Sequence, residues 1–220
     1  MRSSSKLGDL VNLMHLPYTG MVLSFVIVGA AASPTVHPDR LVATLAAYFL
    51  GLGIGAHSLD QLEPNGSHYV QSLSRRDLAV LGAVGMGGAA AIGAYYAATV
   101  TPFLLLFVLA GFFFALAYAL PTLVRGGLFH NNISFAFAWG YLPYLTSYYV
   151  NSQSVPPVVL LGGLPLALAA FAEISLSRSA RRARKQDLPP EAYATAERAL
   201  KLLVALVYLL AGTSALLRLA

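Results

Sequence analysis

The sequence has 220 residues, of which 57% are hydrophobic, 10% are charged and none is cysteine. Because soluble domains carry about 25% charged residues, this composition indicates an integral membrane protein. The lack of cysteine excludes disulfides, thiolate nucleophiles and cysteine-ligated metals. The formal net charge of +5 does not indicate nucleic-acid binding, because the basic residues are distributed as a membrane topology requires.

Apolar stretches of nearly membrane-spanning length dominate the chain. A spanning helix needs about 20 mostly apolar residues, and seven stretches approach or reach that length. They predict an all-α fold, a polytopic transmembrane bundle of about seven helices in a single domain covering residues 1–220. The stretches are Leu16–Ala32, Leu41–Leu59, Leu78–Val100, Phe103–Leu123, Ile133–Val150, Val155–Ile174 and Leu200–Leu217.

Glycines recur in the second and third of these stretches. Small residues let two membrane helices approach closely, so we expect these two helices to pack against neighbours through their glycine faces. The glycines concerned are Gly51, Gly53, Gly55, Gly85, Gly87 and Gly88.

The basic residues predict how the bundle sits in the cell membrane. Most of them fall at the N-terminus or in the three longer loops, at Arg2, Lys6, Arg75, Arg76, Arg125, Arg178, Arg181, Arg182, Arg184 and Lys185. Because basic segments remain cytoplasmic, we expect a cytoplasmic N-terminus and, after seven spans, a C-terminus on the opposite side. Residues 1–12 lack a small-residue cleavage site followed by a soluble domain, so we expect no cleaved signal peptide.

An imidazole and two carboxylates gather where the second apolar stretch meets a polar loop. His57 and Asp60 are three residues apart, so in a helix they share one face. Glu63 would continue that face, but Pro64 biases it away from the helix. The pattern is compatible with a site and also with a plain boundary between the helix and water, where polar residues are ordinary.

Two further cytoplasmic helix ends carry complementary chemistry. The fourth stretch leads through Tyr118 into a loop with Arg125, and the sixth ends in Glu173. A charge inside a spanning helix is a functional-site hypothesis by default, although Glu173 could also be a helix-end carboxylate that reaches water. Carboxylates can hold Mg²⁺ together with substrate phosphates, and arginines bind phosphate oxygens. These helix ends therefore predict a site for a lipid diphosphate.

The order of these landmarks resembles the UbiA superfamily of intramembrane prenyltransferases. Residues 13–20, Leu-Met-His-Leu-Pro-Tyr-Thr-Gly, are similar to the family's opening Arg-Pro segment. Residues 56–60, Ala-His-Ser-Leu-Asp, occupy the place of its first Asp-rich motif. The segment from Tyr118 to Arg125, followed by the helix around Trp139, looks like its tyrosine-plus-basic motif.

The last part of the resemblance lies around the sixth apolar stretch. Glu173 and the later segment Lys185–Pro189 look like the family's second Asp-rich loop. The resemblance covers about Leu13 to Leu217, which corresponds to the first seven of the family's nine helices.

The resemblance implies a chemistry for the site. The family uses the carboxylates of its two motifs to bind Mg²⁺ and the prenyl diphosphate. By this resemblance Asp60 and Glu173 would hold Mg²⁺, and His57 would be a third ligand or a base. The substrate-binding residues that it implies are Tyr118, Arg125, Arg75, Arg76 and Glu63.

Several positions depart from the family pattern. In the first motif Ala56 replaces an asparagine, and His57 and Pro64 replace aspartates. In the second motif Leu176 and Ala180 fall where later aspartates belong. These departures keep a second hypothesis open, a non-catalytic UbiA-like protein that binds a prenyl lipid or a protein partner.

The leading prediction is an integral membrane prenyltransferase that moves a prenyl group from a polyprenyl diphosphate to a lipid or aromatic acceptor. A small transporter is a third hypothesis, which the lack of charged residues at mid-span disfavours. Two other signals have simpler explanations. The cluster Arg181–Lys185 can meet anionic lipid headgroups, and His15, His68 and His130 lack metal-ligand spacing, so we expect them to be solvated or hydrogen-bonded.

Overall fold

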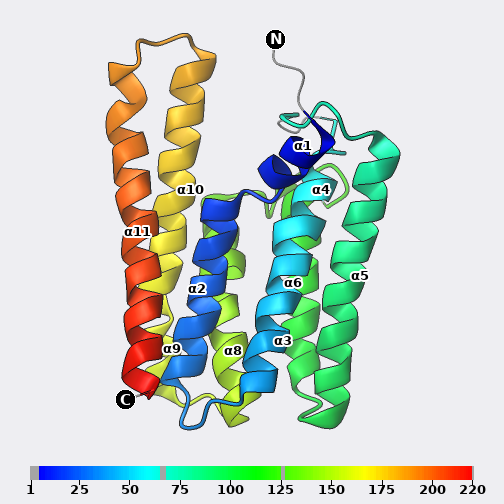
Figure 1. Cartoon of the computed structure of the whole chain (residues 1–220), viewed down its shortest axis with the longest axis vertical. Helices are drawn as coiled ribbons and strands as arrows, with labels where there is room; N and C mark the ends of the chain where they lie inside the picture. The colour runs from blue at the N-terminus through cyan, green and yellow to red at the C-terminus, as the bar shows by residue number, and fades with distance from the viewer. Residues whose placement is uncertain (1–4, 65–67, 125–126, 220) are drawn as a thin grey trace.

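The structure is a computed structural model that describes residues 5–64, 68–124 and 127–219, and the regular secondary structure in these ranges is helical. Its long helices run side by side along one common direction (Figure 1). Four helical segments are long and apolar enough to cross a membrane, and a bent pair at the N-terminal end would make a fifth. The structure therefore agrees with an integral membrane protein.

Unbroken or nearly unbroken helices form the four candidate spans. The first consists of α3 (Pro38–Tyr48), η1 (Phe49–Ala56) and α4 (His57–Asp60), and the second is α5 (Arg75–Thr99). The third joins α9 (Pro157–Gly162) to α10 (Leu164–Lys185), and the fourth is α11 (Glu191–Leu219). The middle part of the first span, η1, is π-helical.

The other predicted stretches are also helical, but none is a candidate span by itself. The bent pair consists of α1 (Lys6–Leu13) and α2 (Leu16–Ala32), whose axes differ by 42°. α6 (Leu104–Ala119) is apolar but shorter, and the remaining helices are α7 (Asn132–Phe135), the π-helical η3 (Ala136–Tyr141) and α8 (Leu142–Ser152). Each of the seven apolar stretches lies largely within a helical segment, but the predicted count of seven spans is not confirmed.

Three helix ends differ most from the ends of the apolar stretches. α6 stops at Ala119, short of the predicted Leu123, because Pro121 disfavours a helical conformation at the residue before it and has no N–H of its own. In contrast, α10 continues beyond its apolar stretch to Lys185, and α11 begins early, at Glu191. These two helices therefore project past most of their neighbours at one end of the bundle (Figure 1).

The segment before α5 is fastened to the N-terminal helix and to the end of α4. The buried carboxylate of Asp9 accepts hydrogen bonds from the amides of Gln71 and Ser72, at 2.9 and 2.6 Å. The side-chain oxygen of Gln61 accepts one from the amide of Tyr69, at 3.1 Å. These contacts hold Tyr69 over the same end of the bundle as α4.

Glycine allows η1 and α5 to cross with their backbones in contact. A Cβ atom added at Gly85 would lie 2.6 Å from the Leu50 carbonyl oxygen and 2.7 Å from the Gly55 amide nitrogen. A Cβ atom at Gly87 would meet no atom within 4 Å. The predicted close packing is therefore confirmed for Gly85 and Gly55, and it is wrong for Gly87.

We predict that Gly85→Ala destabilises the fold by about 1–3 kcal/mol, because the new methyl group must push the η1 backbone away. Gly87→Ala is the matched control on the same helix, and its effect should be neutral or stabilising by up to about 1 kcal/mol through helix propensity. Thermal unfolding of both variants in detergent measures the difference. A similar melting temperature for the two variants would contradict the close crossing.

Candidate functional site

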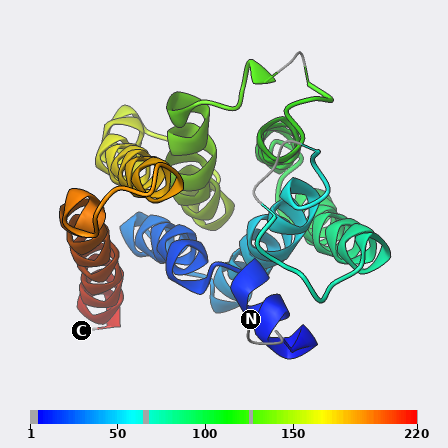
Figure 2. The same cartoon turned by 90° about the horizontal axis from the view of Figure 1, so that it is seen from above.

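A polar cavity of about 610 Å³ opens at the end of the bundle where α2 and α11 begin and α4, α6 and α10 end. Seen from above, α2 lies between the α10–α11 pair on one side and the α3–α5 group on the other (Figure 2). The residues with polar side chains that line the cavity are His15, Tyr18, Thr19, His57, Asp60, Glu63, Tyr69, Tyr118, His130, Trp139, Glu173, Ser177, Arg178, Arg181, Arg184 and Glu197.

Two of the carboxylates that line the cavity are almost fully buried. Glu63 is 2% exposed and Glu173 is 4% exposed, whereas Asp60 is half-buried. One carboxylate oxygen of Glu63, Oε2, accepts a hydrogen bond from the Thr122 hydroxyl at 2.9 Å. The other, Oε1, has no hydrogen-bond partner among the described residues. Because a buried carboxylate is costly without partners, this wall of the cavity is suited to a cationic or hydrogen-bond-donating ligand.

The imidazole of His57 packs against the ring of His15. Its Nδ1 lies 3.1 Å from the Gly53 carbonyl oxygen, which can only accept, so Nδ1 carries the proton and Nε2 keeps a lone pair. The His15 ring meets the His57 ring edge-on, with centroids 5.0 Å apart, and His15 also lies 4.7 Å from the Tyr69 ring. Burial raises the pKa of Tyr69, so its hydroxyl stays protonated as a donor.

The positively charged wall of the cavity comes from α10. Arg178 donates hydrogen bonds to the Tyr118 hydroxyl at 3.0 Å and to Asn132 Oδ1 at 2.6 Å. The Tyr118 ring stacks on the His130 ring with centroids 4.4 Å apart, and His130 Nδ1 donates to the Tyr118 carbonyl oxygen at 2.8 Å. The end of α6, the start of α7 and α10 are therefore joined at the cavity wall.

Most of the sequence-predicted site residues do come together. His57, Asp60, Glu63, Tyr118 and Glu173 all line the polar cavity. They come from α4 and the residues after it, from α6 and from α10. Arg75 and Arg76 are exposed at the start of α5 and are not among the lining residues. Arg125 lies outside the described residues.

Three arginines and two histidines of this site are not among the residues that the sequence predicts for it. The sequence predicts that the cluster Arg181–Lys185 meets lipid headgroups, yet Arg181 and Arg184 line the cavity together with Arg178. It predicts solvated or hydrogen-bonded side chains for His15 and His130, and both line the cavity as well. A usable signal was present, because Glu173, Ser177 and Arg181 are spaced by four residues and share a face if the helix continues. For His15 the sequence carried no such signal, since its position depends on a left-handed backbone conformation with φ of 43° between α1 and α2.

The donors fit a metal ion only in part. Among the described residues no group of three or more His, Asp or Glu side chains is placed to hold a metal ion. Mg²⁺ in proteins is usually held by one or two carboxylates plus substrate phosphates, and Asp60, Glu63 and Glu173 supply carboxylates to one cavity. The described residues therefore form no complete metal site, and these carboxylates would bind Mg²⁺ only together with oxygen ligands from a bound molecule.

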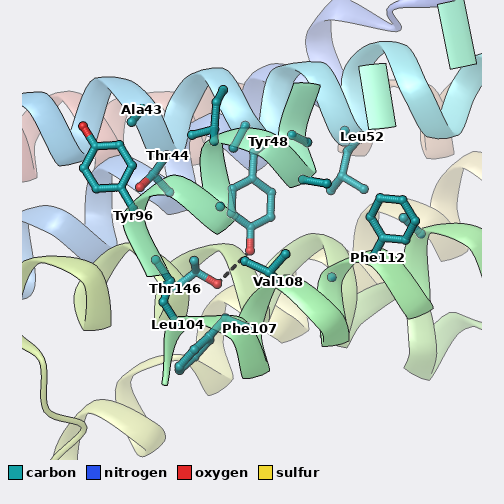
Figure 3. A pocket seen from close by; sticks show the side chains of 18 of the residues that line it. Ala43, Thr44, Tyr48, Leu52, Tyr96, Leu104, Phe107, Val108, Phe112 and Thr146 are labelled. Carbon is teal, nitrogen blue, oxygen red and sulfur yellow. Dashed lines mark hydrogen bonds between the residues drawn. The ribbon is translucent and has the colours of Figure 1, made fainter. Parts of the chain in front are cut away.

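A smaller, apolar pocket of about 100 Å³ lies among α3, η1, α5, α6 and α8 (Figure 3). The hydroxyls of Tyr48 and Thr146 form a hydrogen bond of 2.8 Å at its wall. Leu52 lines this pocket, and Ala56, one helical turn further, lines the polar cavity. The same step leads along α6 from Ala115 to Ala119. The apolar pocket and the polar cavity are therefore about one helical turn apart along η1 and α6.

No protein-family model matches the chain, and no curated protein or solved structure matches it either.

We predict that Thr122→Val lowers the free energy of unfolding by about 1–3 kcal/mol, because it removes the donor to the buried Glu63 carboxylate. Thr99→Val is the matched control, since the Thr99 hydroxyl donates only to the carbonyl oxygen of Tyr95 at an exposed helix end. The control should change stability by less than about 0.5 kcal/mol. Chemical denaturation in detergent measures the free energy of unfolding of both variants. Equal losses would mean that the hydrogen bond from Thr122 to Glu63 does not stabilise the fold.

Proposed function

We propose that this protein is a membrane prenyltransferase, which transfers a prenyl group from a polyprenyl diphosphate to a lipid or aromatic acceptor. The observation that supports it best is the polar cavity at the end of an apolar bundle, where Asp60, Glu63 and Glu173 share the lining with three arginines. A ligand with an apolar chain and a charged phosphate end matches both the bundle and the cavity. The apolar pocket one helical turn away is suited to part of such a chain.

The finer fold assignment belongs to the same proposal. We infer a UbiA-like bundle of seven spans, with α2, α6 and the α7–η3–α8 segment crossing the membrane beside the four longer candidates. In support, the motif-like segments of the sequence, around His57, Tyr118 and Glu173, line one cavity. The π-helical stretches also border it, since Trp139 of η3 is a lining residue and η1 leads directly into His57. Such stretches are frequent at functional sites.

The proposed reaction breaks the bond between the first prenyl carbon and the diphosphate oxygen, and the electron pair leaves with the diphosphate. The resulting allylic cation takes an electron pair from the acceptor, which then loses a proton. Nε2 of His57 is free to accept that proton, because Nδ1 donates to Gly53. The carboxylates stabilise positive charge, and the surrounding helices exclude water, which strengthens both effects.

Mg²⁺, when bound by Asp60 and Glu173 together with the substrate, would neutralise the leaving diphosphate. The arginines and the Tyr69 hydroxyl would orient the diphosphate and donate hydrogen bonds to its oxygens. Because burial keeps Tyr69 protonated, that donor remains available across the working range of pH.

We predict Mg²⁺-dependent diphosphate release that falls at least about 100-fold in Asp60→Asn, because asparagine keeps the shape of the side chain but removes the charge that a hard cation needs. Glu173→Gln should lower the rate less, and His57→Ala should lower it if Nε2 accepts the proton. Glu191→Gln, on the exposed first turn of α11, is the matched control. The assay follows diphosphate release from purified protein with a panel of prenyl diphosphates.

Full activity of Asp60→Asn would contradict the role of this carboxylate. A wild-type protein that releases no diphosphate from any donor but binds prenyl lipids would favour the non-catalytic alternative instead.

The seven-span topology predicts that the two termini lie on opposite sides of the membrane, with the N-terminus cytoplasmic. Within the described residues α1 and the end of α11 already lie at opposite ends of the bundle (Figure 1). Reporter fusions at each terminus, one active only in the cytoplasm and one active only outside it, test the topology. Two cytoplasmic termini would contradict the odd number of spans.

A further inference from the structure

One helix supplies the positive charge of the polar cavity. Arg178, Arg181 and Arg184 of α10 line it, and intervals of three residues place them along one side of the helix. Arg184 pairs with Glu197 of α11, so its charge is balanced. Within the described ranges neither Arg178 nor Arg181 forms an ion pair with a carboxylate. Two guanidinium charges therefore face the cavity without an acidic side chain bonded to either.

Neutral groups hold Arg178 in place. Its two hydrogen bonds, to the Tyr118 hydroxyl and to Asn132 Oδ1, use two of the five N–H donors of a guanidinium group. Asn132 is oriented in turn, because its Nδ2 donates to the Ser175 hydroxyl at 2.9 Å. Neutral acceptors fix the position of the cation without cancelling its charge. Arg178 is thereby preorganised for an anion.

We propose that Arg178 and Arg181 form a phosphoanion site that binds the phosphate end of an amphipathic ligand directly, without a metal ion. Its assignment to a prenyl diphosphate rests on the proposed function; the site itself does not. Guanidinium groups match phosphate oxygens in bidentate geometry. Arg178 and Arg181 share the lining of the cavity with Asp60 and Glu63. One ligand can therefore meet both the arginines, through its phosphate oxygens, and the carboxylates of the same cavity.

The test measures binding of inorganic pyrophosphate to the purified full-length protein in detergent with EDTA, by titration calorimetry. We expect saturable binding that weakens at least about tenfold in Arg181→Gln, since a charge-assisted contact is lost. Arg182→Gln is the matched control, because Arg182 is exposed on the same helix but does not line the cavity. It should leave the affinity within about twofold.

Arg178→Gln should weaken binding to a similar degree. Because Arg178 also joins three elements, Arg178→Gln can fail to fold. In that case Arg181→Gln alone decides the test. Absence of binding in the wild-type protein with EDTA, or an equal loss in Arg181→Gln and Arg182→Gln, overturns the proposal.

A phosphate at this site could belong to a diphosphate substrate or to a lipid headgroup. The same titration in nanodiscs of phosphatidylcholine, with and without phosphatidylglycerol, distinguishes the two sources. Unchanged pyrophosphate affinity supports a diphosphate site. Competition by phosphatidylglycerol that persists in Arg182→Gln supports a headgroup site on the same arginines.

The outcome is separable from that of the proposed function. If pyrophosphate binds without metal and this binding depends on Arg181, but no prenyl donor releases diphosphate, the anion site is supported and the prenyltransferase function is contradicted. If diphosphate is released from a prenyl donor but pyrophosphate does not bind without metal, the prenyltransferase function is supported and the metal-free anion site is contradicted.

Discussion

The contacts of Arg178 connect the parts of the molecule on which the cavity depends. Its guanidinium group joins α10 to Tyr118 at the end of α6 and to Asn132 at the start of α7. A polar group inside an apolar bundle costs free energy unless it finds partners there, so these bonds set where the three helices meet. The stacked rings of Tyr118 and His130 close the same corner. The half-buried Arg178 side chain thus joins three elements at the cavity wall.

Glu63 and His57, which also line the cavity, are less completely paired. Glu63 is buried and has the Thr122 hydroxyl on one oxygen only, while His57 uses its Nδ1 on the Gly53 carbonyl and keeps Nε2 available. A buried polar atom without a hydrogen-bond partner lowers the stability of the fold. A bound ligand can supply the missing partner. Carboxylates and guanidinium groups that line one cavity of about 610 Å³ are the basis of the proposed diphosphate chemistry.

The extended pair α10–α11 explains why the arginines can serve this cavity at all. If α10 ended with its apolar stretch near Ile174, Arg178 and Arg181 would belong to a loop facing the lipid headgroups. Because the helix continues to Lys185, these residues keep a fixed spacing and a fixed side. The ion pair between Arg184 and Glu197 ties the extension to α11. A predicted membrane-surface cluster thereby becomes part of the cavity lining.

The sequence by itself determined the membrane class, the helical content, the approximate extent of the apolar stretches and several cavity residues, among them His57, Asp60 and Glu173. Those features depend on composition, on hydropathy and on spacing within one helix, which are local properties. Tertiary structure alone decided that Arg178 and Arg181 line the cavity while Arg75 does not, and that the left-handed backbone of His15 brings its ring beside His57. It also decided that Gly85, and not Gly87, lies at a helix crossing. These outcomes depend on how far a helix continues and on which face meets a neighbour, and both are set by contacts between residues far apart in the chain.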